Sequence, residues 1–166
     1  LVCFKDPVLS SKKPDLAVKN INGGIWKDNF GKPWLDPYNR DSWQYLIDIA
    51  KEAVQKGFDE IQFDYIRFPN DGDKKAMVFS SNNEQKYEAV NAFLAYARQE
   101  LPNVRLSADV FGIICESPED TEDIGQYLEL IGKDIEYISP MVYPSHYAFG
   151  QTVNNVTFAK PDFEPY

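Results

Sequence analysis

The sequence predicts an α/β fold in which parallel strands alternate with helices. Apolar runs rich in β-branched and aromatic residues alternate with helical patterns along the 166 residues. This order is typical of parallel βαβ units with right-handed crossovers. The strand cores are mostly apolar rather than strictly alternating, as expected where helices cover a sheet. Either about half of a (β/α)8 barrel, whose full length is about 250 residues, or an open sheet fits this pattern.

Four segments are the expected parallel strands. Each is an apolar run bounded by turn signals such as glycine, proline and asparagine. They lie near residues 1–5, 60–66, 104–110 and 135–143. No linker or internal repeat divides the chain, so we expect a single domain over 1–166 that is a fragment of a longer domain.

The clearest helical pattern runs from Arg40 to Lys56, where apolar residues recur at helical spacing. Asn39 or Asp41 would cap its start, and Gly57 would end it. The connection before this helix, residues 7–40, is long and rich in glycine, proline and tryptophan. Loops longer than about 12–15 residues are often functional, although an unstructured insertion is the alternative.

Two further helices are expected later in the chain. One opens with the capping-box pattern Ser81–Glu84 and ends before Pro102. The other follows Thr121 and stops near Gly132. All three helices then lie between consecutive strands, as βαβ units require.

Charge and composition exclude several classes of protein. The formal net charge is −9, and residues 106–166 carry 2 basic against 11 acidic side chains, so no basic face is available for nucleic acid. No apolar run is long enough to be a transmembrane segment. Two cysteines, Cys3 and Cys115, can form one disulfide or none.

We expect no cofactor and no metal. The chain has one histidine and two distant cysteines, which rules out a zinc cluster of the usual spacing. Glycine-rich phosphate loops and the nucleophile elbow of serine hydrolases are also missing from the sequence. The segment Asp71–Asp73 is interpreted as an ordinary polar turn.

The polar residues at the strand ends are the candidate site, because parallel α/β proteins bind ligands beyond the carboxyl ends of their strands. Gln62 and Asp64 share one face of the second strand. A carboxylate on that face is costly unless it is paired, and Arg67 is the candidate partner. A purely structural Asp64–Arg67 ion pair is the alternative.

Asp109 lies at the equivalent end of the next strand, so Asp64 and Asp109 are expected at one rim. Glycoside hydrolysis needs such a pair of carboxylates, one as acid and one as nucleophile or base. A helix cap or a loop brace is the alternative role of Asp109. The pair predicts hydrolysis of O-glycosidic bonds.

Further polar and aromatic residues near the strand ends suit the binding of sugar rings. Trp26, Trp34 and Tyr38 of the first connection could form a stacking wall or merely pack against one another. The expected substrate contacts are Lys5, Asp6, Trp26, Gln62, Tyr65, Arg67, Tyr143 and His146.

Five segments resemble a bacterial family known as putative glycoside hydrolase domains. They are FKDPVL (4–9), GGIWKDNFGKPWLDPYN (23–39), GFDEIQFDYIRFP (57–69), LSADVFG (106–112) and YISPMVYPSHY (137–147). The resemblance implies a (β/α)8 TIM-barrel type fold of about twice this length. It also implies polysaccharide as substrate, Asp64 and Asp109 as the catalytic residues, and an extracellular or cell-envelope location.

The second strand is also similar to the chitinase-type motif Asp-x-x-Asp-x-Asp-x-Glu, but Ile66 stands at the position of the catalytic glutamate. Any general acid is therefore Asp109 or a residue outside the chain. A non-catalytic carbohydrate-binding or cell-wall-associated barrel is the second hypothesis. Self-association is expected if the fragment leaves sheet edges exposed.

Overall fold

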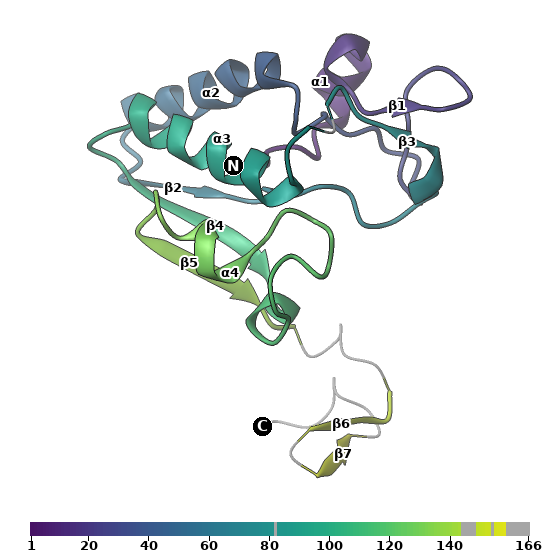
Figure 1. Ribbon diagram of the computed structural model, residues 1–166. Helices are drawn as coiled ribbons and strands as arrows, with labels where there is room; N and C mark the ends of the chain where they lie inside the picture. The colour runs from purple at the N-terminus through teal and green to yellow at the C-terminus, as the bar shows by residue number, and fades with distance from the viewer. Residues whose placement is uncertain (82, 144–148, 154, 159–166) are drawn as a thin grey trace.

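The computed structural model describes residues 1–81, 83–143, 149–153 and 155–158. Its centre is a parallel sheet with the strand order β2-β4-β5, shown in Figure 1. The strands are β2 (Glu60–Phe63), β4 (Arg105–Phe111) and β5 (Tyr137–Met141). A mixed α/β fold with a parallel sheet was predicted, and it is confirmed.

Residues 1–4 extend this sheet beside the carboxyl end of β2. Val2 forms a parallel bridge with Asp64, and the Cys3 N–H donates to the Asp64 carbonyl at 2.8 Å. Pairing starts only where β2 ends, so the expected first strand is a bridge rather than a regular strand. Together the four segments lie side by side in chain order, and no closed barrel forms among the described residues.

The helices α2 (Trp43–Gln55) and α3 (Lys86–Glu100) lie together over one face of the sheet (Figure 1). Helix α2 follows a 3₁₀ turn, Arg40–Ser42. The Asn39 side chain caps this turn by accepting the N–H of Asp41. Gly57, with φ +99°, follows the end of α2, as predicted. The helix predicted from the spacing of apolar residues is therefore confirmed.

Helix α3 starts one turn later than the sequence predicts. Its N-cap is Gln85, whose N–H donates to the Glu88 carboxylate at 2.7 Å, so the Ser81–Glu84 capping box was wrong. The preceding residues are tied to the first connection instead. The Ser80 N–H donates to the Asp36 carboxylate at 2.6 Å, and the Tyr38 hydroxyl contacts the Glu84 carbonyl at 3.0 Å.

The third predicted helix is reduced to α4 (Leu128–Ile131). Residues 121–127 do not join it, because the Asp120 carboxylate accepts the N–H groups of Ile124 and Gly125 and holds a tight loop. Asp123 and Gly125 have positive φ angles of 56° and 84°, which a helix does not allow.

The first connection is folded, which excludes an unstructured insertion. It contains α1 (Pro7–Lys12), a 3₁₀ turn and β1 (Lys19–Asn20), which pairs with β3 (Met77–Val78). Trp26 and Trp34 belong to the hydrophobic core that continues under α2 and α3. Side-chain packing, rather than long strands, holds this connection in place.

A hairpin near the end of the described chain, the state of the two thiols and the length of the helices complete the description of the fold. Strands β6 (Gln151–Val153) and β7 (Val156–Phe158) form an antiparallel hairpin that the sequence did not suggest. The thiols of Cys3 and Cys115 are both free, the first buried and the second exposed. No helix among the described residues has the length and apolarity needed to cross a membrane.

Candidate active site

The structure brings Asp64 and Asp109 to neighbouring strand ends. Phe63 of β2 pairs with Ala108 of β4, so the next position along the two parallel strands places Asp64 beside Asp109. Phe63 is buried beneath the helices, whereas Gln62 and Asp64 alternate to the opposite face. Both carboxylates therefore lie on the side of the sheet away from α2 and α3.

Gln62 connects the two strands on this open face. Its amide nitrogen donates a hydrogen bond to the Asp109 carboxylate. Burial raises the pKa of Asp109, the hydrogen bond from Gln62 lowers it, and the negative charge of Asp64 raises it; the net shift is upward. Asp109 thus holds its proton to a higher pH than a free aspartate.

The Asp64 carboxylate is anchored by the backbone at the strand end. It accepts the N–H of Tyr65 at 2.7 Å, and Tyr65 adopts a left-handed conformation with φ +51°. Such a φ is uncommon for a residue other than glycine. This turn ends β2 and sends the following residues away from the sheet direction.

Arg67 is not the ion-pair partner of Asp64. Among the described residues, the ion pairs include none between these two side chains. Nη1 of Arg67 donates instead to the Phe68 carbonyl at 2.9 Å and to the Asn70 side chain at 3.0 Å. The expected pairing is corrected: the guanidinium bonds to Phe68 and Asn70. Burial lowers the pKa of Arg67, and Asp64 raises it only from beyond ion-pair distance.

The Arg67 guanidinium lies among aromatic rings. Its central carbon is 4.4 Å from the ring centre of Phe111, 5.0 Å from that of Trp34 and 5.3 Å from that of Tyr65. Only 7% of the residue is exposed, and burial lowers its pKa to about 10. The guanidinium therefore stays charged at neutral pH.

Lys5 joins the same cluster from the first connection. Its ammonium lies 5.1 Å from the Tyr65 ring centre and 5.4 Å from that of Trp34, and it forms a 3.2 Å ion pair with Asp28. Burial raises the pKa of Asp28, but hydrogen bonds from Lys32, Trp34, Lys5 and Phe30 outweigh it and the net pKa is lowered. Asp28 thus stays charged beside Lys5.

Two expected substrate contacts have structural partners instead. Trp26 is 1% exposed, and its indole nitrogen donates to the Asp73 carbonyl at 2.9 Å. Its ring face is therefore covered, and the prediction that a sugar stacks on Trp26 is wrong. Asp6 caps α1 by accepting the N–H groups of Val8 and Leu9, each at 2.9 Å. This cap commits the Asp6 carboxylate to the backbone.

The remaining expected contacts follow β5. Tyr143 is 53% exposed, two residues after the end of that strand. His146 lies outside the described residues, as do its neighbours Ser145 and Tyr147. Their roles stay predictions.

Gln126 is a site residue that sequence reasoning missed. It is 1% exposed, its amide nitrogen donates to the carbonyls of Ile66 and Asp109, and its oxygen accepts the Phe111 N–H at 2.9 Å. It ties the chain after β2 to the end of β4. A single glutamine in a loop has no recognisable pattern in the sequence. Only the folded structure shows that its side chain is buried with its polar atoms hydrogen-bonded.

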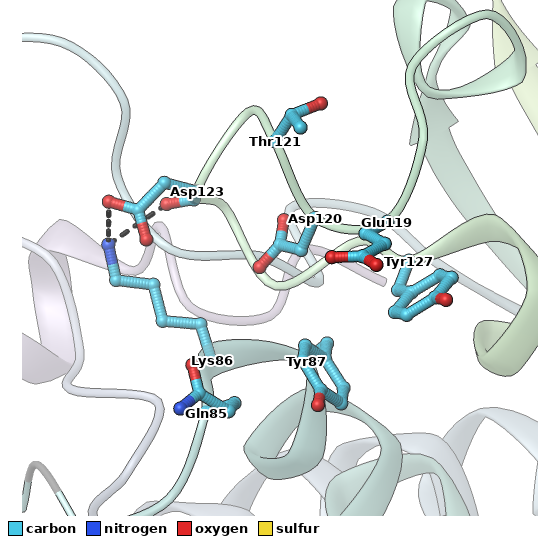
Figure 2. A pocket seen from close by; sticks show the side chains of 8 residues that line it. All are labelled: Gln85, Lys86, Tyr87, Glu119, Asp120, Thr121, Asp123 and Tyr127. Carbon is cyan, nitrogen blue, oxygen red and sulfur yellow. Dashed lines mark hydrogen bonds and ion pairs between the residues drawn. The ribbon is translucent and has the colours of Figure 1, made fainter.

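Beside the rim, the loop after β4 and the start of α3 enclose a hollow of about 430 Å³, shown in Figure 2. The Lys86 ammonium pairs with Asp123 at 2.7 Å across it, and the rings of Tyr87 and Tyr127 meet edge to face. The lining contains neither Asp64 nor Asp109. Among the residues that the structure describes, no His, Cys, Asp or Glu cluster suits a metal ion.

The chain is similar to a protein family and to several solved structures. A sequence profile of the family described as "Putative glycosyl hydrolase domain" matches residues 1–166. A crystal structure of a hypothetical protein from Ruminiclostridium thermocellum ATCC 27405 is 70% identical, with a TM-score of 0.63 over 69% of this chain. The match spans 58% of that protein, and no curated protein matches the chain.

Two solved structures of an α-galactosidase from Thermus thermophilus also align with part of the chain. The complex with p-nitrophenyl α-D-galactopyranoside is 19% identical, with a TM-score of 0.43 over 63% of this chain and 21% of the enzyme. The complex with stachyose is 18% identical, with a TM-score of 0.44 over 63% and 22% of the two chains.

Proposed function

Since the chain belongs to the family described as "Putative glycosyl hydrolase domain", we propose that it hydrolyses O-glycosidic bonds through Asp64 and Asp109. The observation that supports this most strongly is the placement of the two carboxylates beside one another at the open face of the parallel sheet. Sites of parallel α/β proteins lie at this end of the strands. A polysaccharide is the proposed substrate.

Asp109 is the proposed general acid. A general acid must hold its proton near the working pH until the leaving oxygen receives it. Burial raises the pKa of Asp109, the Gln62 hydrogen bond lowers it and the Asp64 charge raises it, so the net effect favours the protonated form. Gln62 would also orient the carboxyl group through its hydrogen bond.

Asp64 is the proposed nucleophile or general base. Its hydrogen bond from the Tyr65 N–H orients one carboxylate oxygen and leaves the other for the anomeric carbon or a water. Carboxyl groups about 5–5.5 Å apart give retention of configuration, and groups about 6.5–9.5 Å apart give inversion. Tyr143 and His146 are proposed to contact the sugar, and the location is proposed to be extracellular or at the cell envelope.

The sheet is proposed to be a segment of a (β/α)8 barrel. The four parallel segments lie side by side in chain order, and α2 and α3 cover one face. A barrel has this arrangement, because its helices all lie outside and its strand ends line one rim. An open doubly wound sheet instead has helices on both faces and a reversal of strand order.

The proposal is tested by comparing Asp64→Asn with Asp109→Asn on two kinds of glycoside. Substrates with activated aryl leaving groups need little acid assistance, whereas natural oligosaccharides need it fully. Asp109→Asn should therefore lose about 10²–10⁴-fold on oligosaccharides but much less on 4-nitrophenyl glycosides. Asp64→Asn should lose activity on both, and turnover is followed by released 4-nitrophenol and by new reducing ends.

Asp48→Asn is the matched control. Asp48 is exposed on α2, and α2 lies over the face of the sheet opposite to the two site carboxylates. It should leave turnover unchanged. Equal losses for Asp109→Asn on both substrates would remove the general-acid role. Unchanged turnover in both site variants would reject the carboxylate pair.

A carbohydrate-binding domain without turnover is the second candidate. Ile66, at the position of the chitinase-type catalytic glutamate, is fully buried in the core, so substrate-assisted chitinase chemistry has no acid there. A wild-type protein that binds oligosaccharides but releases no reducing ends would favour this candidate. Asp64→Asn would then change affinity alone.

A further inference from the structure

Arg67 is a buried cation with no carboxylate within ion-pair distance among the described residues. It is 7% exposed, and the ion pairs of the described chain do not include it. Burying a charge is costly, and proteins normally compensate it with an opposite charge. Burial lowers the pKa of Arg67, and the charges of Asp71 and Asp64 raise it from beyond ion-pair distance without outweighing burial, so the buried cation is only partly compensated.

The guanidinium keeps donors for a ligand. Nη1 bonds to the Phe68 carbonyl and the Asn70 side chain, while Nε and Nη2 bond to no described residue. Among the described residues, only an oxygen of Asp71 is a side-chain polar atom that is both sealed from solvent and without a hydrogen bond. Nε and Nη2 of Arg67 lack a hydrogen bond to any described residue but are not sealed, so they retain contact with solvent. These two nitrogens form the edge that binds an oxyanion through two parallel hydrogen bonds.

Aromatic rings hold this edge in place. Trp34 and Tyr65 lie 5.0 and 5.3 Å from the Arg67 guanidinium carbon, and the same two rings lie 5.4 and 5.1 Å from the Lys5 ammonium. Trp34 is 1% exposed, and its indole nitrogen bonds to Asp28 at 3.2 Å. The two cations are thus preorganised around one rigid ring pair.

The cluster adjoins the proposed catalytic carboxylates. Arg67 follows Asp64 by three residues, and Phe111, which it contacts at 4.4 Å, follows Asp109 on the same face of β4. Lys5 comes directly after the segment that bridges to Asp64. Two cations therefore lie at this rim of a protein whose net charge is −9.

We propose that Arg67, with Lys5 beside it, binds a single oxyanion substituent on the sugar unit next to the scissile bond. The substituent is a carboxylate, as in a uronic acid, or a sulfate ester. The sugar part of this inference rests on the proposed function, whereas the oxyanion part rests on the Arg67 cluster alone. An extended polyanion would be repelled by the acidic surface, so one local charge is the feature that is recognised.

Binding is tested by calorimetric or ligand-observed NMR titration with methyl β-D-glucuronide and methyl β-D-galacturonide. Each is compared with its neutral glycoside, and glucose 6-sulfate distinguishes a sulfate ester from a carboxylate. The wild-type protein should prefer at least one anionic sugar about tenfold or more, as expected for charge-assisted hydrogen bonds. Arg67→Gln should abolish this preference, and Arg67→Lys should keep only part of it.

Arg40→Gln is the matched control. Arg40 also lies over an aromatic ring, 5.1 Å from the ring centre of Trp43, but it is exposed and belongs to the 3₁₀ turn before α2. It should leave the preference unchanged. If Arg67→Gln does not fold, Lys5→Gln replaces it, because the Lys5 side chain is 21% exposed; it should weaken the preference severalfold.

Titration needs no turnover, so the two proposals fail separately. A preference that depends on Arg67 in a protein without hydrolase activity would reject the proposed function alone. Turnover that depends on Asp64 and Asp109, with equal affinity for anionic and neutral sugars, would overturn this inference alone. A preference that survives Arg67→Gln in a folded protein, or Lys5→Gln where that variant stands in, would also overturn it.

Discussion

The surroundings of the Asp109 carboxyl group disfavour its ionised form. Burial and the Asp64 charge both favour its neutral form, and the Gln62 hydrogen bond only partly compensates. A group whose pKa is raised by folding stabilises the protein below its unfolded pKa, and this stabilisation is lost as the pH rises through the folded pKa. Ionised Asp109 at neutral pH therefore costs stability.

Asp109→Asn should stabilise the protein at pH 7, because the amide oxygen still accepts the Gln62 hydrogen bond and carries no charge. The gain should not exceed about 1 kcal/mol, since solvent screens a half-buried carboxylate. It should vanish below about pH 4, where Asp109 is protonated in both states. Urea unfolding at pH 7 and pH 3.5 measures it, and a variant that is less stable at pH 7 contradicts the account.

Arg67 illustrates a misread residue. Its spacing from Asp64 suggested an ion pair, because three residues along a chain often bring side chains together. The left-handed backbone at Tyr65 instead turns Arg67 toward Trp34, Tyr65 and Phe111. A positive φ at a tyrosine has no signature in the sequence, so the pairing could not be judged from spacing alone.

At the scale of elements, Gln126 ties the chain after β2 to the end of β4. Its side chain satisfies the carbonyls of Ile66 and Asp109 and the N–H of Phe111 from a buried position. Replacing it leaves three backbone groups without their partner. Unsatisfied buried groups cost about 1–3 kcal/mol each before relaxation or water entry.

Gln126→Ala should therefore lower the free energy of unfolding by about 2–4 kcal/mol. The comparison is Gln44→Ala, where an exposed glutamine on α2 donates to Asp48 at 2.7 Å and accepts the Tyr96 hydroxyl; its cost should stay below about 0.5 kcal/mol because both bonds are exposed. Urea unfolding of both variants gives the two values. Equal small costs would show that the Gln126 bonds are readily replaced by water.

The misplaced helix ends have a shared cause. The Ser81–Glu84 capping pattern is sound locally, but Asp36 and Tyr38 of the first connection bind the backbone at Ser80 and Glu84. The loop before α4 is likewise organised by Asp120 rather than by helical periodicity. Side chains distant in sequence or committed to a tight loop outweigh local helix propensity, which is worth less than about 1 kcal/mol per residue.

At the scale of the whole molecule, charge is unevenly spread. Residues 1–105 carry 15 basic and 15 acidic side chains, whereas residues 106–166 carry 2 and 11. The net charge of −9 repels itself in the folded state more than in the expanded unfolded state. Salt screens this repulsion over a distance of about 10 Å at 0.1 M.

The melting temperature should therefore rise by a few degrees between about 0.01 and 0.2 M NaCl at pH 7. Surface ion pairs weaken over the same range, but each contributes only about 0–1 kcal/mol. Differential scanning calorimetry follows the change, with equimolar sucrose as a control for non-ionic effects. A melting temperature that falls with salt would show that attractive pairs dominate the electrostatics.

The sequence alone predicted parallel strands alternating with helices, a long helix over Arg40–Lys56 that forms at Trp43–Gln55, and the placement of Asp64 and Asp109 at neighbouring strand ends. These depend on hydrophobic periodicity and on the geometry of βαβ units, which are local or topological properties. Only the tertiary structure decided that Arg67 lies among aromatic rings, that Trp26 is covered, and that Gln126 ties the chain after β2 to β4. Those features depend on burial and on contacts between distant segments, which a linear pattern does not record.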